Sequence, residues 1–423
     1  MSWLPLQGIK VADFSALIPG PFASAILSDL GADVIKVEPP RGDSGRSLLP
    51  AVFHATNRNK RSLALDLKHA DAKPVIGRLA RWADVVIESN RPGVTARLGI
   101  DYASMSALNP GLIYCSLSGF GQNGPWRSKP GHDIGYVGAS GGLSYPGSWL
   151  GKPARSSIPI ADMQGGSFGT IAILAALQER ARTGKGTELD LSLYEAGLFC
   201  AALRHGIAEH TDPRAHIWPV NDLFETADGS VLILGIVEQH FWESFRVAVR
   251  DLAPEMKDPK FDTDPSRRKH GDELSRLLKK LFLQKTARQW LELLEAQDVP
   301  VELPLTPAEA SRSDYARARE DVAEVDGERH MLFPLWANGR RAGALRRGTP
   351  ALNADGAVVL QELGFAPHEI ERILRSAAAG SAAGASGAAG PRGAAGPRSA
   401  GGPDAAAEPD GAAGPDGAAG EKG

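Results

Sequence analysis

Three short segments of the chain carry side chains that could act as general acids, general bases or nucleophiles. They hold the neighbours His132 and Asp133, the aspartate Asp162, and the glutamate Glu238. A histidine beside a carboxylate can move protons near neutral pH, and an aspartate can also act as a covalent nucleophile. These residue types therefore indicate proton transfer or covalent catalysis.

Each of these residues also has a purely structural interpretation. A histidine at a junction between a loop and a helix is often a capping residue, and Asp133 is suited to a helix N-cap. Asp162 lies between an apolar segment and a helix start rich in small residues, which favours an N-cap as well. Its neighbours Gly165 and Gly166 could instead expose backbone N–H groups and build an oxyanion-binding corner. Glu238 on its own is typical of a solvated first turn of a helix.

The segment Gly119-Phe120-Gly121-Gln122-Asn123-Gly124 has the glycine spacing of a dinucleotide-binding loop and follows a predicted strand. Such a site needs a helix that opens directly after the glycines, and Pro125 and Pro130 leave no room for one. We interpret the segment as a glycine-rich turn that permits close backbone approach, to the protein itself or to a ligand.

The elements that would position these residues alternate in type over the first 120 residues. Short β-branched runs alternate with amphipathic stretches of helical length, the pattern of a parallel α/β sheet. We predict strands at 9–14, 34–37, 63–67, 84–87 and 112–117, and helices at 22–30 and 71–82. The fold class is therefore α/β, with a large Rossmann-like domain.

The rest of the chain predicts a smaller α+β domain and a tail. We expect an apolar helix at 165–182, a strand at 187–191, a hairpin at 224–235, two helical segments within 273–297, the second starting at Thr286, and a last helix from near Pro367. The domain boundaries are 1–200 for the large Rossmann-like domain, 201–330 for the small domain, 331–376 for a segment returning to the large domain, and 377–423 for a disordered tail. The tail is rich in Ala, Gly and Pro and has few side chains large enough to bury.

Composition excludes several classes of partner and site. The net charge is −3 with 23% charged residues, and the basic residues are scattered, so neither nucleic acid nor a membrane is the expected partner. The chain has two cysteines, Cys115 and Cys200, which we interpret as buried thiols of a reducing compartment, and no metal site is expected from their spacing. The start of the sequence does not resemble a signal peptide, and no apolar run reaches the roughly 20 residues that span a bilayer. The cytoplasm is the expected location.

Seven successive blocks of the sequence resemble the class III CoA-transferase family, also called CaiB/BaiF. Among them are LGADVIKVEPPRGDSGR, NRNKRSLALDL, PGHDIGYVGASGGLS, IADMQGGSFGTIAILAALQERARTGKGTELDLSLYEA and FETADGSVLILGIVEQHFW, and the resemblance runs in order from about residue 5 to 375. It implies an enzyme acting on acyl-coenzyme A, with a Rossmann-like domain, a small domain and an interlocked homodimer. The blocks are most similar to those of α-methylacyl-CoA racemase.

The resemblance implies two alternative roles for Asp162. In the family's transferases the matching aspartate is a nucleophile that attacks the acyl-CoA thioester, forms a mixed anhydride, and passes CoA to an incoming carboxylate. In the racemase it exchanges the α-proton together with a histidine that matches His132, which a glutamate matching Glu238 orients. All three positions are filled, so we predict racemase-like proton transfer on a 2-methylacyl-CoA.

The sequence departs from the racemase pattern after the aspartate. A run of glycines is usual there, whereas this chain reads Met163-Gln164-Gly165-Gly166. CoA transfer through an Asp162 anhydride therefore stays an open alternative, and a non-catalytic protein that binds CoA thioesters is a third.

The resemblance also implies where coenzyme A binds. Its phosphates need cations and exposed backbone N–H groups, and the matching positions are Arg58, Lys60, Arg61 and Arg91, with Gly121 as a close backbone approach. Each of these cations could equally be a solvated surface residue. No cofactor is expected to be bound permanently, because coenzyme A enters as part of the substrate.

Overall fold

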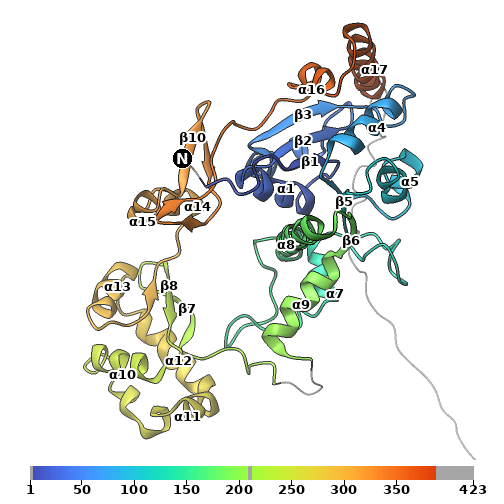
Figure 1. The fold of residues 1–423 in the computed structure, drawn as a ribbon. Coiled ribbons are helices and arrows are strands. Elements are labelled where there is room, and N and C mark those ends of the chain that lie inside the picture. Colours follow the sequence, from blue (N-terminus) through green and yellow to red (C-terminus); the bar gives the residue numbers. More distant parts are fainter. Residues whose placement is uncertain (1–2, 208–211, 387–423) are drawn as a thin grey trace, which may run out of the picture.

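The computed structural model describes residues 3–207 and 212–386 (Figure 1). A six-stranded sheet forms the centre of the larger domain, with the strand order β3-β2-β1-β4-β5-β6 and every neighbouring pair parallel. The strands are β1 (Lys10–Asp13), β2 (Asp33–Glu38), β3 (Lys60–Ala64), β4 (Val85–Glu88), β5 (Ile113–Ser118) and β6 (Thr187–Ser192). The predicted Rossmann-like sheet is confirmed. The order in which the strands are added reverses between β1 and β4, and ligands of such sheets bind at this reversal.

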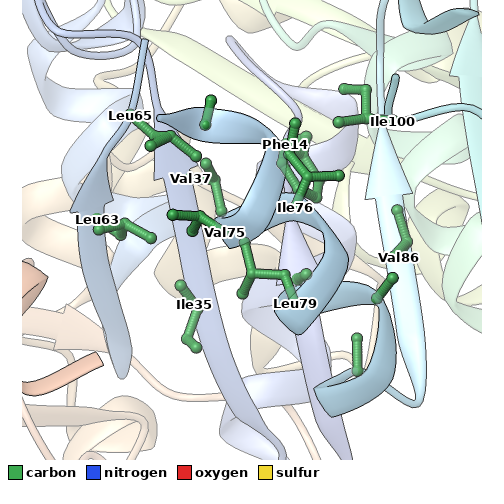
Figure 2. Packing of buried hydrophobic residues seen from close by; sticks show 14 of the residues in the cluster. Phe14, Ile35, Val37, Leu63, Leu65, Val75, Ile76, Leu79, Val86 and Ile100 are labelled. Atoms are coloured by element: carbon green, nitrogen blue, oxygen red, sulfur yellow. The ribbon is translucent and has the colours of Figure 1, made fainter. Parts of the chain in front are cut away.

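Helices cover both faces of this sheet because its central strands are apolar on both sides. One face packs against α4 (Ala72–Trp82), α6 (Tyr102–Ser106), α16 (Gly356–Glu362) and α17 (Pro367–Ser386). The other face packs against α1 (Pro19–Asp29) and α8 (Ile160–Thr183). Figure 2 shows the first core, where Val75, Ile76 and Leu79 of α4 point at apolar side chains of the sheet.

Helix α8 is apolar and long enough to cross a membrane, judged by length and composition alone. Core helices of soluble proteins have the same property, and α8 packs on α1, β5 and β6. The structure is therefore consistent with a soluble protein, while the cytoplasm stays a prediction.

The smaller domain has its own sheet and its own core. Its antiparallel strands are β7 (Asn221–Glu225), β8 (Val231–Gly235) and β9 (Val301–Glu302). Around them lie α10 (Gln239–Ala248), α11 (Asp264–Lys269), α12 (Gly271–Phe282), α13 (Ala287–Glu295) and 3-10 turns at Pro254–Lys257 and Pro259–Phe261. The predicted hairpin and the two predicted helices are confirmed, and Thr286 forms a capping box with Gln289. In Figure 1 this domain lies apart from the six-stranded sheet.

Shorter elements complete the described chain. They are α2 (Gly45–Leu48), α3 (Pro50–Asn57), α5 (Val94–Leu98), α7 (Asp133–Ala139), α9 (Leu193–His205), α14 (Pro307–Ala310), α15 (Asp314–Ala318), β10 (Val322–Val325), β11 (Glu328–Met331), β12 (Trp336–Ala337) and β13 (Arg340–Arg341). The chain then returns to β3, where the side chains of Asp355 and Asn353 accept hydrogen bonds of 2.9 Å from the backbone of Ser62 and Ala64.

Several boundaries differ from the sequence prediction. Helix α1 begins at Pro19 rather than at 22, because a proline fits the first turn of a helix, where its missing N–H costs no hydrogen bond. Strand β3 begins at Lys60 rather than at 63, because its buried residues Lys60 and Ser62 are polar and hide the strand pattern. Helix α8 begins at Ile160 rather than at 165. Helix α17 continues to Ser386, and Ala377 is buried, so the first residues of the predicted tail are helical. The remainder of that tail, 387–423, lies outside the described residues.

Candidate active site

A cavity of about 250 Å³ lies at the carboxyl ends of β1, β4 and β5. This is the side of a doubly wound sheet on which ligands bind, next to the reversal of strand order. The residues that line it are Ala16, Leu17, Pro19, Ser89, Asn90, Arg91, Pro92, Leu117, Ser118, Gly119, Phe120, Arg127, Lys129, Gly131, His132, Tyr136, Asp162 and Leu193. The fold thus brings together His132, Asp162 and Arg91 of the predicted site.

Asp162 stands in the first turn of α8, and Asp133 holds that turn in place. One oxygen of Asp133 accepts hydrogen bonds from the backbone N–H groups of Ala161 at 2.7 Å and Asp162 at 3.2 Å. Burial, and then the charge of Asp133, raise the pKa of Asp162 to about 7. An aspartate in this environment can exchange a proton near neutral pH.

Gly165 and Gly166 do not form the oxyanion-binding corner that was one interpretation of the sequence. Both lie inside α8, and both are buried. A Cβ on Gly165 would lie 2.2 Å from Leu193, and one on Gly166 would lie 2.7 Å from the carbonyl oxygen of Pro19. Because α8 begins at Ile160, both glycines lie inside the helix rather than before it. Their lack of a side chain allows α8 to pack closely on Leu193 and on the backbone of Pro19.

His132 occupies the N-cap position of α7, but its side chain makes no capping hydrogen bond. Its side chain is exposed and lines the cavity together with Tyr136. Two glycines make room for the Tyr136 ring, since a Cβ on Gly119 or on Gly131 would lie 2.5 Å from it. Burial and the nearby charge of Asp162 raise the pKa of Tyr136, whereas Arg91 lowers it. Tyr136 is therefore within electrostatic reach of both Asp162 and Arg91.

Glu238 is not in the cavity. It is an exposed N-cap residue of α10 in the small domain, and its side chain makes no capping hydrogen bond. Within this single chain the structure therefore does not bring Glu238 to His132.

The predicted phosphate-binding cations divide into two groups. Arg91 lines the cavity, and among the described residues its side chain has no hydrogen bond or ion pair. Arg58 pairs with Asp29, and Arg61 pairs with Asp33 and Glu362. These two arginines hold parts of the fold together and are not brought to the cavity.

Lys60 is also absent from the cavity lining and is completely buried. Its ammonium group lies 3.1 Å from the carboxylate of Asp13 and donates to the side chain of Asn57 and the carbonyl of Pro21. A lysine with every proton used in the core has none left for a phosphate. The sequence suggested a phosphate-binding lysine, whereas the structure shows a buried ion pair between Lys60 and Asp13.

A second buried pair supports the cavity wall. Lys36 lies 2.9 Å from Asp43, and both side chains are almost completely buried. Another oxygen of Asp43 accepts a hydrogen bond of 3.1 Å from the backbone N–H of Leu17. Leu17 has a φ of +66°, which is unusual for a leucine and often marks a functional site.

Gly121 and the surrounding glycines form a turn, as predicted. Gly121 has a φ of +79°, does not line the cavity, and is followed by Gln122, whose backbone N–H donates to Asp190. The next helix is α7, which begins at Asp133. No helix opens at the glycines, so the turn lacks the anion-binding helix start of a dinucleotide site.

Sequence reasoning missed two cations that line the cavity, Arg127 and Lys129. They follow the glycine-rich turn in a proline-containing loop, where nothing local distinguishes them from solvated residues. The ammonium group of Lys129 lies 4.7 Å from the centre of the Trp126 ring and 5.3 Å from that of Phe120. With Arg91 they make the cavity suited to an anionic ligand.

Comparison with known proteins assigns the family. The pattern of CoA-transferase family III matches residues 6–356. The chain belongs to CoA-transferase family III. The predicted family is thus confirmed, and the protein is an enzyme of this family.

Relatives within family III carry the names of two kinds of enzyme. Acetyl-CoA:oxalate CoA-transferase of Acetobacter aceti is 33% identical over 377 residues, covering 85% of this chain and 95% of that protein. Human α-methylacyl-CoA racemase is 30% identical over 383 residues, covering 88% and 96%. A crystal structure of a CAIB/BAIF family protein from Brucella suis has a TM-score of 0.77 at 31% identity and covers 86% of this chain and 100% of that one. An acyl-CoA substrate is consistent with this family membership.

Proposed function

We propose that this family III enzyme exchanges the α-proton of a 2-methylacyl-CoA thioester, with His132 and Asp162 as the two proton-transferring groups. The observation that carries the proposal is that both side chains line one cavity while the pKa of Asp162 is raised to about 7. In one direction the Asp162 carboxylate takes the α-proton, the bond electrons form an enolate, and protonated His132 returns a proton to the opposite face. The reverse reaction exchanges the two roles.

Charged and polar groups in the cavity support binding of the thioester. Arg91, Arg127 and Lys129 can contact the phosphates of coenzyme A, and the Tyr136 hydroxyl offers a hydrogen bond near the reacting carbon. A developing enolate oxygen gains from fixed donors of this kind. Coenzyme A arrives and leaves with the substrate, and the proposal requires no permanently bound cofactor.

CoA transfer is the second candidate, favoured by Met163 and Gln164 after the aspartate and by the name of the A. aceti relative. In that reaction the Asp162 carboxylate attacks the thioester carbonyl carbon and expels the CoA thiolate. The CoA thiolate then attacks the aspartyl carbonyl of this mixed anhydride and releases the first acid, which leaves an Asp162–CoA thioester. The incoming carboxylate attacks that thioester, expels the thiolate and forms a second mixed anhydride. Attack of the thiolate on the acyl carbonyl of this anhydride gives the new acyl-CoA and frees Asp162. His132 would then have no proton to move.

We further propose an interlocked homodimer in which Glu238 of a second copy reaches His132. Within one chain Glu238 is exposed and outside the cavity, so this role needs another molecule. Helices α8 and α9 also expose large apolar side chains, with 60% of Ile171, 56% of Phe199 and 74% of Leu203 accessible. Apolar surface of this kind marks interfaces between proteins.

Proton NMR in D2O distinguishes the two reactions. The enzyme is incubated with a 2-methylacyl-CoA, and the α-proton signal is followed with and without succinate. Loss of the signal without succinate supports proton exchange. Persistence of the signal together with succinate-dependent formation of succinyl-CoA would contradict it and support CoA transfer.

A further inference from the structure

Three side chains of the types that bind transition metals meet far from the cavity. His54 comes from α3, and Glu328 and His330 come from β11. Nε2 of His54 lies 3.0 Å from a carboxylate oxygen of Glu328, and Nε2 of His330 lies 3.8 Å from the same oxygen. One ligand atom from each residue falls within 4.8 Å of the other two. The two imidazole rings stack with their centres 4.8 Å apart.

His330 lacks the partner that a buried imidazole normally has. Its side chain is 1% exposed, and its Nε2 has no hydrogen bond within the part of the chain that the structure describes. Leaving such a group unpaired is costly, so buried polar atoms nearly always have a partner.

An ordinary ion pair explains only part of this arrangement. Protonated His54 and Glu328 would attract each other at the observed 3.0 Å. That pair leaves Nε2 of His330 unsatisfied although it points at the same carboxylate.

We propose that His54, Glu328 and His330 form a binding site for a divalent transition metal of the Zn²⁺ type. Two imidazole nitrogens and a carboxylate oxygen are ligands that zinc accepts, with a solvent molecule in the fourth position. Bond lengths of about 2.0–2.1 Å put neighbouring ligand atoms of a tetrahedral ion about 3.3 Å apart. The observed separations need only small side-chain movements to reach this value.

The site would fasten two distant segments of the chain to each other. Helix α3 follows the second strand of the large domain, whereas β10 and β11 lie on the path from the small domain back to the sheet. Gly348 leaves space beside the ligands, since a Cβ there would lie 3.5 Å from the Glu328 carboxylate and 3.2 Å from that of Asp326. This second acid adds negative charge that favours a cation. The metal would act as a structural cross-link, because the cluster lies outside the catalytic cavity.

The test is titration of the full-length protein with ZnCl2 by calorimetry after treatment with a chelator. We expect one equivalent per chain, and an affinity at least tenfold lower in His54→Gln, Glu328→Gln and His330→Gln. His69→Gln is the matched control, because His69 is an exposed histidine beside Asp71 with no third ligand. His216→Gln is a second control, because the His216 ring lies edge-on to that of His205, with the ring centres 4.3 Å apart, and this pair could attract zinc separately.

Thermal unfolding supplies an independent readout. Zinc should raise the melting temperature of the native protein and of both controls, but not of the three ligand variants. Glu328 is only half-buried, so Glu328→Gln keeps the test valid if His330→Gln does not fold. Absence of saturable binding, equal binding by the ligand variants, or loss of binding only in His216→Gln would each overturn the proposal. So would an equal loss of stability in His54→Gln with and without zinc, which would reveal an ion pair alone.

Discussion

The carboxylate of Asp133 accepts a hydrogen bond from the backbone N–H of Asp162 at 3.2 Å. The residue next to His132 thereby holds the start of the helix that carries Asp162. The negative charge of Asp133 also adds to burial in raising the pKa of Asp162 to about 7. The residue beside His132 thus fixes the position of Asp162 and also influences its protonation.

Asp162→Asn should lower kcat by at least about a hundredfold, the scale of general acid–base catalysis, because the amide can neither take a proton nor attack a thioester. The measurement is turnover of a 2-methylacyl-CoA in both assays, with CoA binding as the control. Activity within a few-fold of the native enzyme would contradict both proposed reactions and leave Asp162 as a structural residue.

The same variant should change the pH dependence of stability. The pKa of Asp162 in the folded state, about 7, lies above its usual value of 3.8, so the folded protein holds this proton more tightly than the unfolded chain. Stability is therefore lost as the pH rises from about 4 through 7. Asp162→Asn should be more stable than the native enzyme at pH 8, by up to about 4 kcal/mol, and the difference should shrink towards pH 4. Denaturant unfolding at both pH values checks this, and a pH-independent difference would refute it.

His132→Asn should separate the two reactions. A two-base racemase loses proton exchange about as severely as with Asp162→Asn, because one face of the α-carbon has no proton donor. A CoA-transferase should keep measurable CoA exchange. The variant should melt like the native protein, because the His132 side chain is exposed and makes no capping hydrogen bond.

Asp133→Asn and Asp133→Ala should differ in an informative way. The asparagine keeps an oxygen that can accept the hydrogen bonds from Ala161 and Asp162 but removes the charge, so the pKa of Asp162 should fall. The acidic limb of the profile of kcat against pH should then move to lower pH. The alanine also loses the helix cap, at a cost of about 1 kcal/mol. An unchanged acidic limb in Asp133→Asn would show that the charge has no influence.

Lys60→Met should lower the stability of the fold, whereas Arg91→Ala should weaken substrate binding. Lys60→Met leaves the buried Asp13 without its closest cation and should cost about 3–5 kcal/mol of stability. Arg91→Ala should leave the melting temperature within about a degree and raise KM for acyl-CoA several-fold, more strongly at low salt. Unfolding curves and steady-state kinetics on both variants check this. A rise in KM without loss of stability in Lys60→Met would restore Lys60 as a phosphate contact.

Phe199→Glu should disturb the proposed dimer. Phe199 is 56% exposed on α9, and a charge there would not tolerate burial between two chains. Sedimentation should show loss of dimer together with loss of activity, because Glu238 would no longer reach His132. A native protein that is already a folded monomer at nanomolar concentration would contradict the proposal.

The sequence alone determined most of the large domain and nominated the proposed catalytic residues. The alternation of β-branched and amphipathic segments predicted the parallel sheet, because in such sheets buried strands and half-buried helices differ in hydrophobic period. The motifs around His132 and Asp162 are also local. They could be read without knowing what lies across from them in space.

Tertiary structure decided the role of every charge that depends on a distant partner. Lys60, Arg58 and Arg61 appear as free cations in the sequence, yet each meets an acid from another element. The capping of α8 by Asp133 arises in the same way, as does the meeting of His54 with His330. Burial and Coulomb interactions depend on distances across the fold, and those distances exist only once the chain has packed.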